Sequence, residues 1–372
     1  MTIEQACHSV GTVETQYFHY DGAVELESGE SLGPITLAYE TYGALTPAKD
    51  NAILVLHALT GDAHAAGVHA TPHDPPWWDD MIGPGKAFDT ERFFVICSNI
   101  IGGCMGSTGP KSLNPRTGEP YALDFPIITI GDMVNAQHLL MQALGIERWY
   151  AVTGGSMGGM QALQWATAYP AQVEHCIAIA TTHRLSAQSI GFDAVGRTAI
   201  MRDPNWEEGR YYGKDAPANG LSVARMIGHI TYLSEQSMHE KFGRSLRHAE
   251  EYTWGFDPEF SVETYLANRG DAFVKRFDAN SYLYITKAMD YFDLGARAGS
   301  LVQAFKGVTA RFLVLSYSSD WLFPTTQSKE IVRALSLNGI DVSSMEIDSP
   351  YGHDAFLKEF DENTKLITGF LR

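Results

Sequence analysis

Cysteine is scarce in this chain, and the cysteines present are not paired in the sequence. The 372 residues include four of them, Cys7, Cys97, Cys104 and Cys176, and no two have a Cys-x-x-Cys spacing. This scatter argues against a disulfide framework and favours reduced thiols. We therefore expect a cytoplasmic protein.

Long apolar runs are also missing. No stretch of about 18 consecutive apolar residues occurs, so we expect no membrane-spanning helix. The first residues, Met1 to Gln5, include no basic group and no apolar run. We therefore expect no signal peptide and no membrane partner.

Basic residues are few relative to acidic ones. Lys and Arg number 27 against 44 Asp and Glu, which gives a formal net charge of −17. Such a charge repels nucleic acid and anionic membranes at long range, so we expect neither as a partner. An anionic small molecule could still bind in a local basic pocket. The composition, 45% hydrophobic and 19% charged, is typical of a globular enzyme.

Strand and helix patterns alternate on both sides of a long helical segment. Apolar runs predict strands near 35–42, 53–57, 93–98, 149–153, 174–180, 311–316 and 342–347, and a helix near 132–144. Alternation of this kind predicts an α/β fold with a mostly parallel sheet and helices on both faces. From 184 to 304 the strand patterns nearly vanish, and helical segments such as 221–233 and 281–291 dominate. We interpret 1–183 and 305–372 as one discontinuous core domain and 184–304 as a helical lid inserted into it.

The most informative segment is Gly-Gly-Ser-Met-Gly-Gly at 154–159, between a predicted strand and a predicted helix that starts at Met160. A serine on a tight strand-to-helix turn needs small neighbours, because its backbone is strained and other chain segments pass close to it. The pattern is typical of a nucleophile elbow, which exposes the serine hydroxyl beside the positive end of a helix. A glycine-rich turn with a capping serine is the alternative, and the flanking strand and helix favour a nucleophilic Ser156.

A nucleophilic serine needs a base and a group that orients the base. Behind such an elbow the chain order is serine, then acid, then histidine. Asp320 and His353 each follow one of the last two predicted strands, at the sheet edge where Ser156 also emerges. We predict that these three form a catalytic triad. Asp354 is the rival acid, but an immediate neighbour of His353 usually points elsewhere.

An oxyanion hole requires two backbone N–H groups near the serine. One is predicted to be that of Met157, directly after the nucleophile. The other should come from the loop after an early strand. The loop Ala58–Asp62 follows the strand at 53–57, so we assign the second donor to Leu59.

Two other patterns carry less chemistry. The glycine-rich segment Gly102–Lys111 lacks the Gly-Lys-Ser/Thr of a phosphate-binding loop, so we interpret it as a structured loop. Four histidines, His57, His64, His69 and His73, lie close together in the sequence. Pro72 interrupts any helix that would align them, and no His-Glu-x-x-His is present, so we predict no metal site.

Arg225 and Tyr232 are seven residues apart in a predicted helix and therefore share a face. Such an arginine is either a surface residue with a buried stem or a planar clamp for a substrate carboxylate.

Several motifs together resemble the homoserine O-acyltransferases of the α/β-hydrolase fold. They lie at His57–Gly61, Gly102–Cys104, Gly154–Ala162, Ala224–Met226, Phe277–Asn280 and Gly352–Phe356, and so span nearly the whole chain. The resemblance implies an enzyme that acylates the hydroxyl of L-homoserine from an acyl-CoA, for methionine biosynthesis. It implies acyl-CoA as a co-substrate, no permanently bound cofactor, and a homodimer formed through the helical insertion.

The resemblance also assigns residues to roles. Ser156, Asp320 and His353 are similar to the triad of that family. Arg225 resembles its ligand for the substrate carboxylate, and Asp354 resembles the residue that binds the amino group. Tyr232 and Thr60 resemble supporting residues of the pocket.

The acyl donor follows from one position. In the succinyl-CoA branch an arginine resembling a carboxylate partner stands two residues after the triad aspartate, where this chain has Leu322. Burying a succinyl carboxylate without a cation is costly, so Leu322 favours acetyl-CoA. Segments 228–234 and 287–292 are more similar to the succinyl branch, which keeps succinyl-CoA as an alternative.

Three further alternatives stay open. They are acylation of L-serine, an esterase or thioesterase of the same fold, and a non-catalytic binding protein on this scaffold. A transferase must hold its acceptor and exclude water, which a plain hydrolase need not do. The pair of Arg225 and Asp354 would hold a zwitterionic acceptor at two points, and this favours the transferase.

Overall fold

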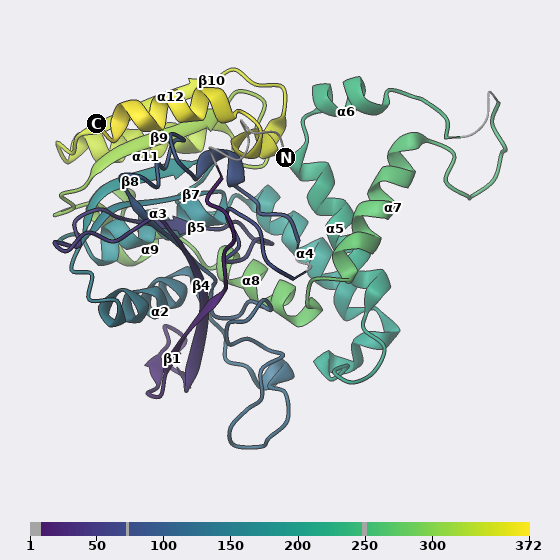
Figure 1. The fold of residues 1–372 in the computed structure, drawn as a ribbon. Coiled ribbons are helices and arrows are strands. Elements are labelled where there is room, and N and C mark those ends of the chain that lie inside the picture. The colour runs from purple at the N-terminus through teal and green to yellow at the C-terminus, as the bar shows by residue number, and fades with distance from the viewer. Residues whose placement is uncertain (1–8, 72–73, 248–250) are drawn as a thin grey trace.

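The computed structural model describes residues 9–71, 74–247 and 251–372. Its main sheet has eight strands in the order β1-β4-β6-β5-β7-β8-β9-β10 (Figure 1). The strands are β1 Gln16–Tyr20, β4 Ile35–Tyr42, β5 Ala52–Leu56, β6 Phe94–Ser98, β7 Trp149–Gly155, β8 Val173–Ile179, β9 Arg311–Tyr317 and β10 Val342–Ile347. The pairings of β1 with β4 and of β4 with β6 are antiparallel, and all pairings from β6 to β10 are parallel. A small antiparallel ribbon joins β2 Val24–Glu25 to β3 Ser31–Leu32.

The central strands are buried on both faces. Every residue of β5 is buried, and its side chains alternate between two apolar layers, as the period of a strand requires. Leu54 and Leu56 pack in the layer that contains helices α2 (Ile130–Ala143), α3 (Met157–Ala168) and α11 (Thr325–Leu337). Ile53 and Val55 pack in the opposite layer, with α12 (Phe360–Phe370). The predicted α/β fold, with a mostly parallel sheet and helices on both faces, is therefore confirmed.

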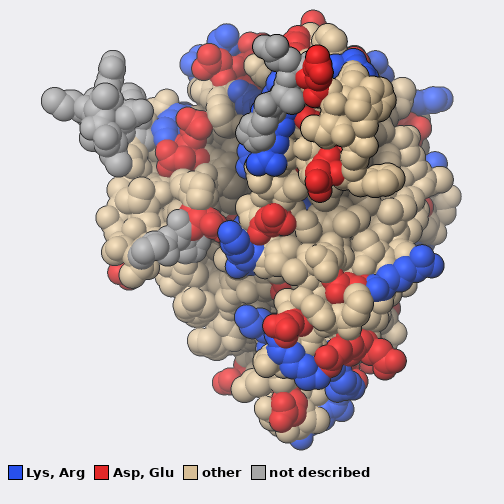
Figure 2. Space-filling model, turned by 90° about the vertical axis from the view of Figure 1, so that its right-hand side faces the viewer, with Lys and Arg blue, Asp and Glu red and all other residues tan. Residues whose placement is uncertain are grey.

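Between β8 and β9 the described chain forms helices and no named strand. They are α4 Ala187–Met201, α5 Ala218–Tyr232, α6 Glu235–Phe242, α7 Ser261–Val274, α8 Ala279–Asp290, α9 Leu294–Ala298 and α10 Leu301–Ala304, with the 3-10 segment η3 Pro204–Gly209. Figure 1 shows α5, α6 and α7 extending to one side of the sheet, while α8 returns toward it. Positive and negative side chains are interspersed on the face seen in Figure 2. We call residues 184–304 the helical insertion.

Short 3-10 segments complete the core. These are η1 Asp79–Met81, η2 Ala122–Asp124 and η4 Gly352–Leu357. Cys97, Cys104 and Cys176 are free thiols, whereas Cys7 lies outside the described residues, as do Met1–Gln5 and the pair Pro72–His73. None of the helices in the described ranges is both long and apolar enough to cross a membrane.

Candidate active site

Ser156 lies on a sharp turn between β7 and α3. Its backbone has φ 59° and ψ −123°, which is a strained conformation for a residue with a side chain. A Cβ at Gly154 would lie 2.5 Å from the carbonyl oxygen of Leu56, and one at Gly158 would overlap the same oxygen. The elbow therefore fits against β5 only because its flanking residues are glycines. α3 begins at Met157, directly after the serine and three residues before the predicted start at Met160.

Three residues from distant parts of the chain meet at this turn. The Nε2 atom of His353 lies 2.8 Å from the hydroxyl of Ser156, and its Nδ1 lies 2.7 Å from Oδ2 of Asp320. All three residues are at most 6% exposed. With both imidazole nitrogens occupied in this way, Asp320 rather than the rival Asp354 lies opposite Nδ1.

The carboxylate of Asp320 is fixed by its own loop. Its Oδ1 accepts hydrogen bonds from the backbone N–H groups of Leu322 and Phe323 at 3.0 and 2.9 Å. Oδ2 is thereby directed to His353. An N–H on Nδ1 can donate to Asp320, so Nε2 is left to accept the proton of Ser156.

The charge state of His353 follows from two opposed effects. Burial alone would lower its pKa, but the negative charge and the hydrogen bond of Asp320, together with the charge of Asp354, outweigh burial and raise the pKa above the ordinary value. The imidazole is therefore a stronger base than a free histidine. This is the property that proton removal from a serine hydroxyl requires.

The loop Ala58–Asp62, which we call the oxyanion loop, faces the serine from the end of β5. Leu59 lines the same cavity as Ser156. Within the described residues, no acceptor is hydrogen-bonded to the Leu59 N–H. Met157 is the first residue of α3, and a first helical N–H has no partner inside its helix. In the part of the chain that the structure describes, both N–H groups are therefore free of the partners that would prevent them from serving as the predicted oxyanion donors.

The predicted acceptor-binding residues gather on the insertion side of His353. Arg225 Nη1 donates to the hydroxyl of Thr60 at 3.1 Å, and its guanidinium lies 5.7 Å from the ring centre of Tyr232. The Tyr232 ring lies 6.2 Å from the imidazole of His353. Burial raises the pKa of Asp354, and the positive charge of Arg225 is among the groups that oppose this rise. Arg225, Thr60 and Tyr232 therefore lie together beside His353.

Two cavities meet this region. One of about 300 Å³ is lined by Arg225 and Thr60. The other, of only about 40 Å³, is lined by Ser156 and Leu322, and no Lys or Arg is among its described lining residues. The small cavity thus offers no cation to an anionic acyl group.

Two charged residues of the insertion that were not predicted from the sequence also line these cavities. Asp193 of α4 lines the smaller one, and burial, together with the charge of Asp290, raises its pKa to about 8. Arg276 lines the larger one. Neither residue belongs to a recognisable motif, so only the packing of the insertion on the core could identify them.

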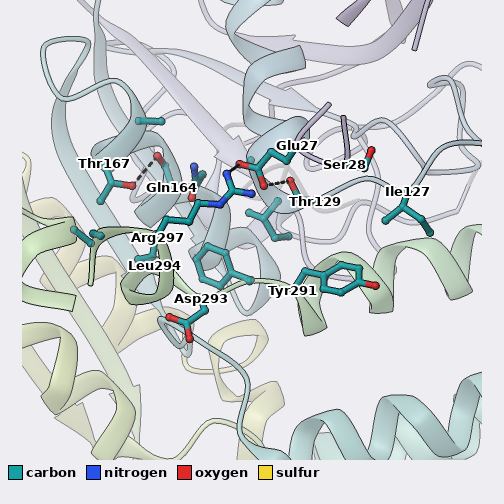
Figure 3. Close-up of a pocket in the computed structure, with 16 residues that line it drawn as sticks. Glu27, Ser28, Ile127, Thr129, Gln164, Thr167, Tyr291, Asp293, Leu294 and Arg297 are labelled. Carbon is teal, nitrogen blue, oxygen red and sulfur yellow. Dashed lines mark hydrogen bonds and ion pairs between the residues drawn. The ribbon is translucent and has the colours of Figure 1, made fainter. Parts of the chain in front are cut away.

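A larger cavity lies away from the triad. It measures about 670 Å³ and is lined from both the core and the insertion, and Figure 3 shows Arg297 and Thr129 converging there on Glu27. The distances are 2.6 Å from Arg297 and 2.7 Å from Thr129. No triad residue lines this cavity.

Among the described residues, one group could hold a metal ion. It consists of Glu40, His64 and His69, with ligand atoms within 4.8 Å of one another. Both oxygens of Glu40 accept from these imidazoles at 2.9 and 2.8 Å, and also from Thr15 and Tyr42. Hydrogen bonds alone satisfy this carboxylate, so we assign the group no metal.

Comparisons with known proteins were made for the whole chain. The family model of the α/β hydrolase fold matches residues 51–360. The homoserine O-acetyltransferase of Methanohalobium evestigatum is 57% identical over 98% of this chain and 74% of its own length. The crystal structure of homoserine O-acetyltransferase from Bacillus anthracis has a TM-score of 0.91 at 32% identity, over 97% of this chain and 98% of that one. The crystal structure of esterase E22 has a TM-score of 0.90 at 32% identity, over 97% of this chain and 100% of that one.

The first prediction concerns the pH at which His353 becomes a base. Only the neutral imidazole can accept the serine proton, so the rate of acyl-enzyme formation should rise with pH through a pKa above the ordinary value of about 6.5. Asp320→Asn removes the negative charge, so the inflection should move to lower pH and the plateau rate should fall by roughly 10²–10⁴-fold. The measurement is p-nitrophenol release from p-nitrophenyl acetate between pH 5 and 9. An inflection that does not move in Asp320→Asn would contradict this coupling.

Proposed function

The chain belongs to the α/β-hydrolase-fold family and, within it, to the homoserine O-acetyltransferases, and from this membership we propose that it moves an acetyl group from acetyl-CoA to the hydroxyl of L-homoserine. The product, O-acetylhomoserine, is an intermediate of methionine biosynthesis. The observation that carries the proposal is the hydrogen-bonded series Ser156–His353–Asp320 beside the cluster of Arg225, Tyr232 and Thr60.

In the first half-reaction Ser156 attacks the thioester carbonyl of acetyl-CoA. His353 Nε2 takes the hydroxyl proton as the Oγ–C bond forms. The negative oxygen of the tetrahedral intermediate is stabilised by the N–H groups of Leu59 and Met157. The C–S bond then breaks and CoA leaves as a thiolate, which needs little acid help. The proton on His353 passes to the departing thiolate or to solvent, so acetyl-Ser156 remains beside a neutral imidazole.

In the second half-reaction the acceptor replaces CoA. His353 Nε2 takes the proton of the homoserine hydroxyl, and the oxygen attacks the acetyl carbonyl. The same oxyanion hole holds the second tetrahedral intermediate. The bond to Ser156 breaks, the serine regains a proton from His353, and O-acetylhomoserine leaves. This sequence predicts ping-pong kinetics with a free acetyl-enzyme.

The acceptor is held at two points. Its carboxylate would pair with the guanidinium of Arg225 in a fork geometry that suits a carboxylate. Its ammonium group would pair with Asp354, and Thr60 and Tyr232 would complete the pocket. L-Serine is one methylene shorter than homoserine, so its hydroxyl would fall short of the acetyl carbonyl when its charged groups are held at the same two points. This favours homoserine.

The donor is limited by the small cavity at Ser156. A volume of about 40 Å³ suits an acetyl group better than a succinyl group, which adds two methylenes and a carboxylate. Leu322 lines the cavity and no Lys or Arg does so among its described lining residues, so an incoming carboxylate would meet an apolar side chain and no cation. Acetyl-CoA is therefore the better donor.

We propose that the helical insertion has two further roles. It covers the site as a lid, which keeps water from the acetyl-enzyme. It also supplies a homodimer interface, because α4 and α5 expose large apolar side chains: Val195 is 54% exposed, Met201 45%, Val223 43% and Ile230 41%. The free thiols of Cys97, Cys104 and Cys176 favour a reducing, cytoplasmic setting.

The second prediction distinguishes the role of Ser156 as nucleophile from the role of Arg225 as ligand of the acceptor carboxylate. Ser156→Ala should abolish acetyl-enzyme formation, seen by intact-protein mass spectrometry after mixing with acetyl-CoA. Arg225→Ala should leave the rate of CoA release in a single turnover within about threefold, because acylation needs no acceptor. The same variant should lower the rate of O-acetylhomoserine formation by about 10²-fold or more, because the loss of one partner of a buried charge pair costs roughly 2–5 kcal/mol. Equal losses in both half-reactions would refute the role of Arg225.

The third prediction concerns the donor. With L-homoserine present, kcat/KM for acetyl-CoA should exceed that for succinyl-CoA by at least about 100-fold, since an unpaired buried carboxylate costs several kcal/mol. Leu322→Arg supplies a cation and should raise the succinyl rate, while Leu322→Met, of similar volume, should not. The products are identified by mass spectrometry. A wild-type preference for succinyl-CoA would overturn the acetyl assignment.

The fourth prediction concerns assembly. Light scattering should give twice the chain mass of 40.9 kDa. The double variant Val195→Asp/Val223→Asp should give the mass of one chain, because charges on the exposed apolar surface prevent its burial. The matched control is Leu337→Asp. Leu337 is also an exposed apolar residue, at 64%, but it lies in α11 and outside the helical insertion, so this variant should leave the dimer intact. A monomeric wild type would contradict the dimer.

A further inference from the structure

Two arginines of the insertion hydrogen-bond to Thr60 of the oxyanion loop, and only one of them binds its main chain. Arg225 Nη1 donates to the Thr60 hydroxyl at 3.1 Å, whereas Arg276 Nη2 donates to the Thr60 carbonyl oxygen at 2.8 Å. The first contact is one that an incoming carboxylate would compete for, because Arg225 is the proposed acceptor ligand. The second goes to the main chain and is independent of the acceptor.

Arg276 is itself well anchored. It lies between α7 and α8, and its side chain is 28% exposed. Its Nε lies 2.9 Å from Oδ2 of Asp74, and its Nη2 lies 3.7 Å from Oδ2 of Asp62. Asp62 in turn accepts the backbone N–H of His64 at 2.9 Å. The guanidinium therefore contacts the oxyanion loop at Thr60 and Asp62.

The Thr60 carbonyl is connected to the proposed oxyanion donor through the main chain and one hydrogen bond. It shares a peptide group with the N–H of Gly61, which donates to the carbonyl of Ala58 at 2.9 Å. The Ala58 carbonyl shares a peptide group with the N–H of Leu59, the proposed oxyanion donor. Arg276 is thus linked to that donor through two planar peptide groups joined by one hydrogen bond.

Such a series has two physical effects. Each peptide group is planar, so fixing its carbonyl fixes the direction of its N–H. Hydrogen bonds in series also polarise one another, so a positive charge at one end makes the N–H at the other end a stronger donor. Both effects act on a group that must meet a developing negative charge.

We propose that Arg276 is a positioning residue that directs and polarises the Leu59 N–H through the peptide groups of Thr60–Gly61 and Ala58–Leu59. It serves both half-reactions, because both pass through an oxyanion at the same place. The proposal rests on the proposed acyl-enzyme function, and it assigns Arg276 no contact with either substrate.

The test measures the two half-reactions in a series of Arg276 variants. Lys keeps the positive charge and one donor nitrogen in place of three, Gln keeps one uncharged donor nitrogen, and Met keeps neither charge nor donor. The acylation rate with p-nitrophenyl acetate should fall in the order Arg, Lys, Gln, Met, with Met slower by roughly 10–10³-fold, up to the cost of one oxyanion donor. The rate of transfer to L-homoserine should fall by a similar factor. The KM values for p-nitrophenyl acetate and L-homoserine should change by less than about threefold.

Arg297→Met is the matched control. Arg297 also belongs to the insertion and forms an ion pair with the core, to Glu27 at 2.6 Å, beside the remote cavity of Figure 3. Both half-reactions should keep their wild-type rates in this variant. Arg225→Ala supplies the opposite comparison, since it should slow transfer alone.

Three results would overturn the proposal. The first is acylation by Arg276→Met within twofold of the wild type, and the second is an effect confined to the KM for L-homoserine. The third is a Lys variant as slow as the Met variant. If the Met variant does not fold, the Gln variant takes its place in these comparisons. Acylation by Arg276→Gln within twofold of the wild type, or a Lys variant as slow as the Gln variant, would then overturn the proposal. Acylation by p-nitrophenyl acetate needs neither CoA nor homoserine, so a wild type that makes no O-acetylhomoserine would refute the proposed function and leave this test valid.

Discussion

The hydrogen bond between Asp320 and His353 is the interaction on which the rest of the site depends. At 2.7 Å and with both residues almost fully buried, it raises the pKa of an imidazole whose burial would otherwise lower it. It also fixes which nitrogen faces Ser156. The two backbone N–H groups that bind Asp320 Oδ1 keep the carboxylate in place, so the loop after β9 determines the proton-accepting capacity of a residue after β10.

The parallel sheet explains why these residues meet. The elbow follows β7, Asp320 follows β9, His353 follows β10, and the oxyanion loop follows β5. Parallel strands bring all their carboxyl ends to one edge, so four loops far apart in the sequence converge there. The insertion then contributes Arg225 from α5 to the same edge.

Features with a local signal in the sequence could be predicted, whereas features that arise from packing between distant segments could not. The strands and the grouping of Ser156, Asp320 and His353 could be predicted, because apolar runs, glycines and chain order are local signals. The expected start of α3 at Met160 is three residues late, because Gly158 and Gly159 contribute no apolar side chain to the helical pattern. Asp193 and Arg276 could not be found, because their importance arises only from the way the insertion packs on the core.

Water competes with the amino-acid acceptor for the acetyl-enzyme, so the active site must favour the acceptor over water. Water is present at about 55 M, and an amino-acid acceptor at millimolar levels must outcompete it by a factor of roughly 10⁵ to be acylated preferentially, within the range that well-oriented reactants reach. An esterase of nearly the same overall fold has no such requirement. The difference must therefore lie in residues that act on the acceptor rather than on the acetyl-enzyme. Arg225, the proposed acceptor ligand, would meet this condition, because its guanidinium lies beside the Tyr232 ring and that ring lies beside His353. The triad and the oxyanion loop would serve water and homoserine alike.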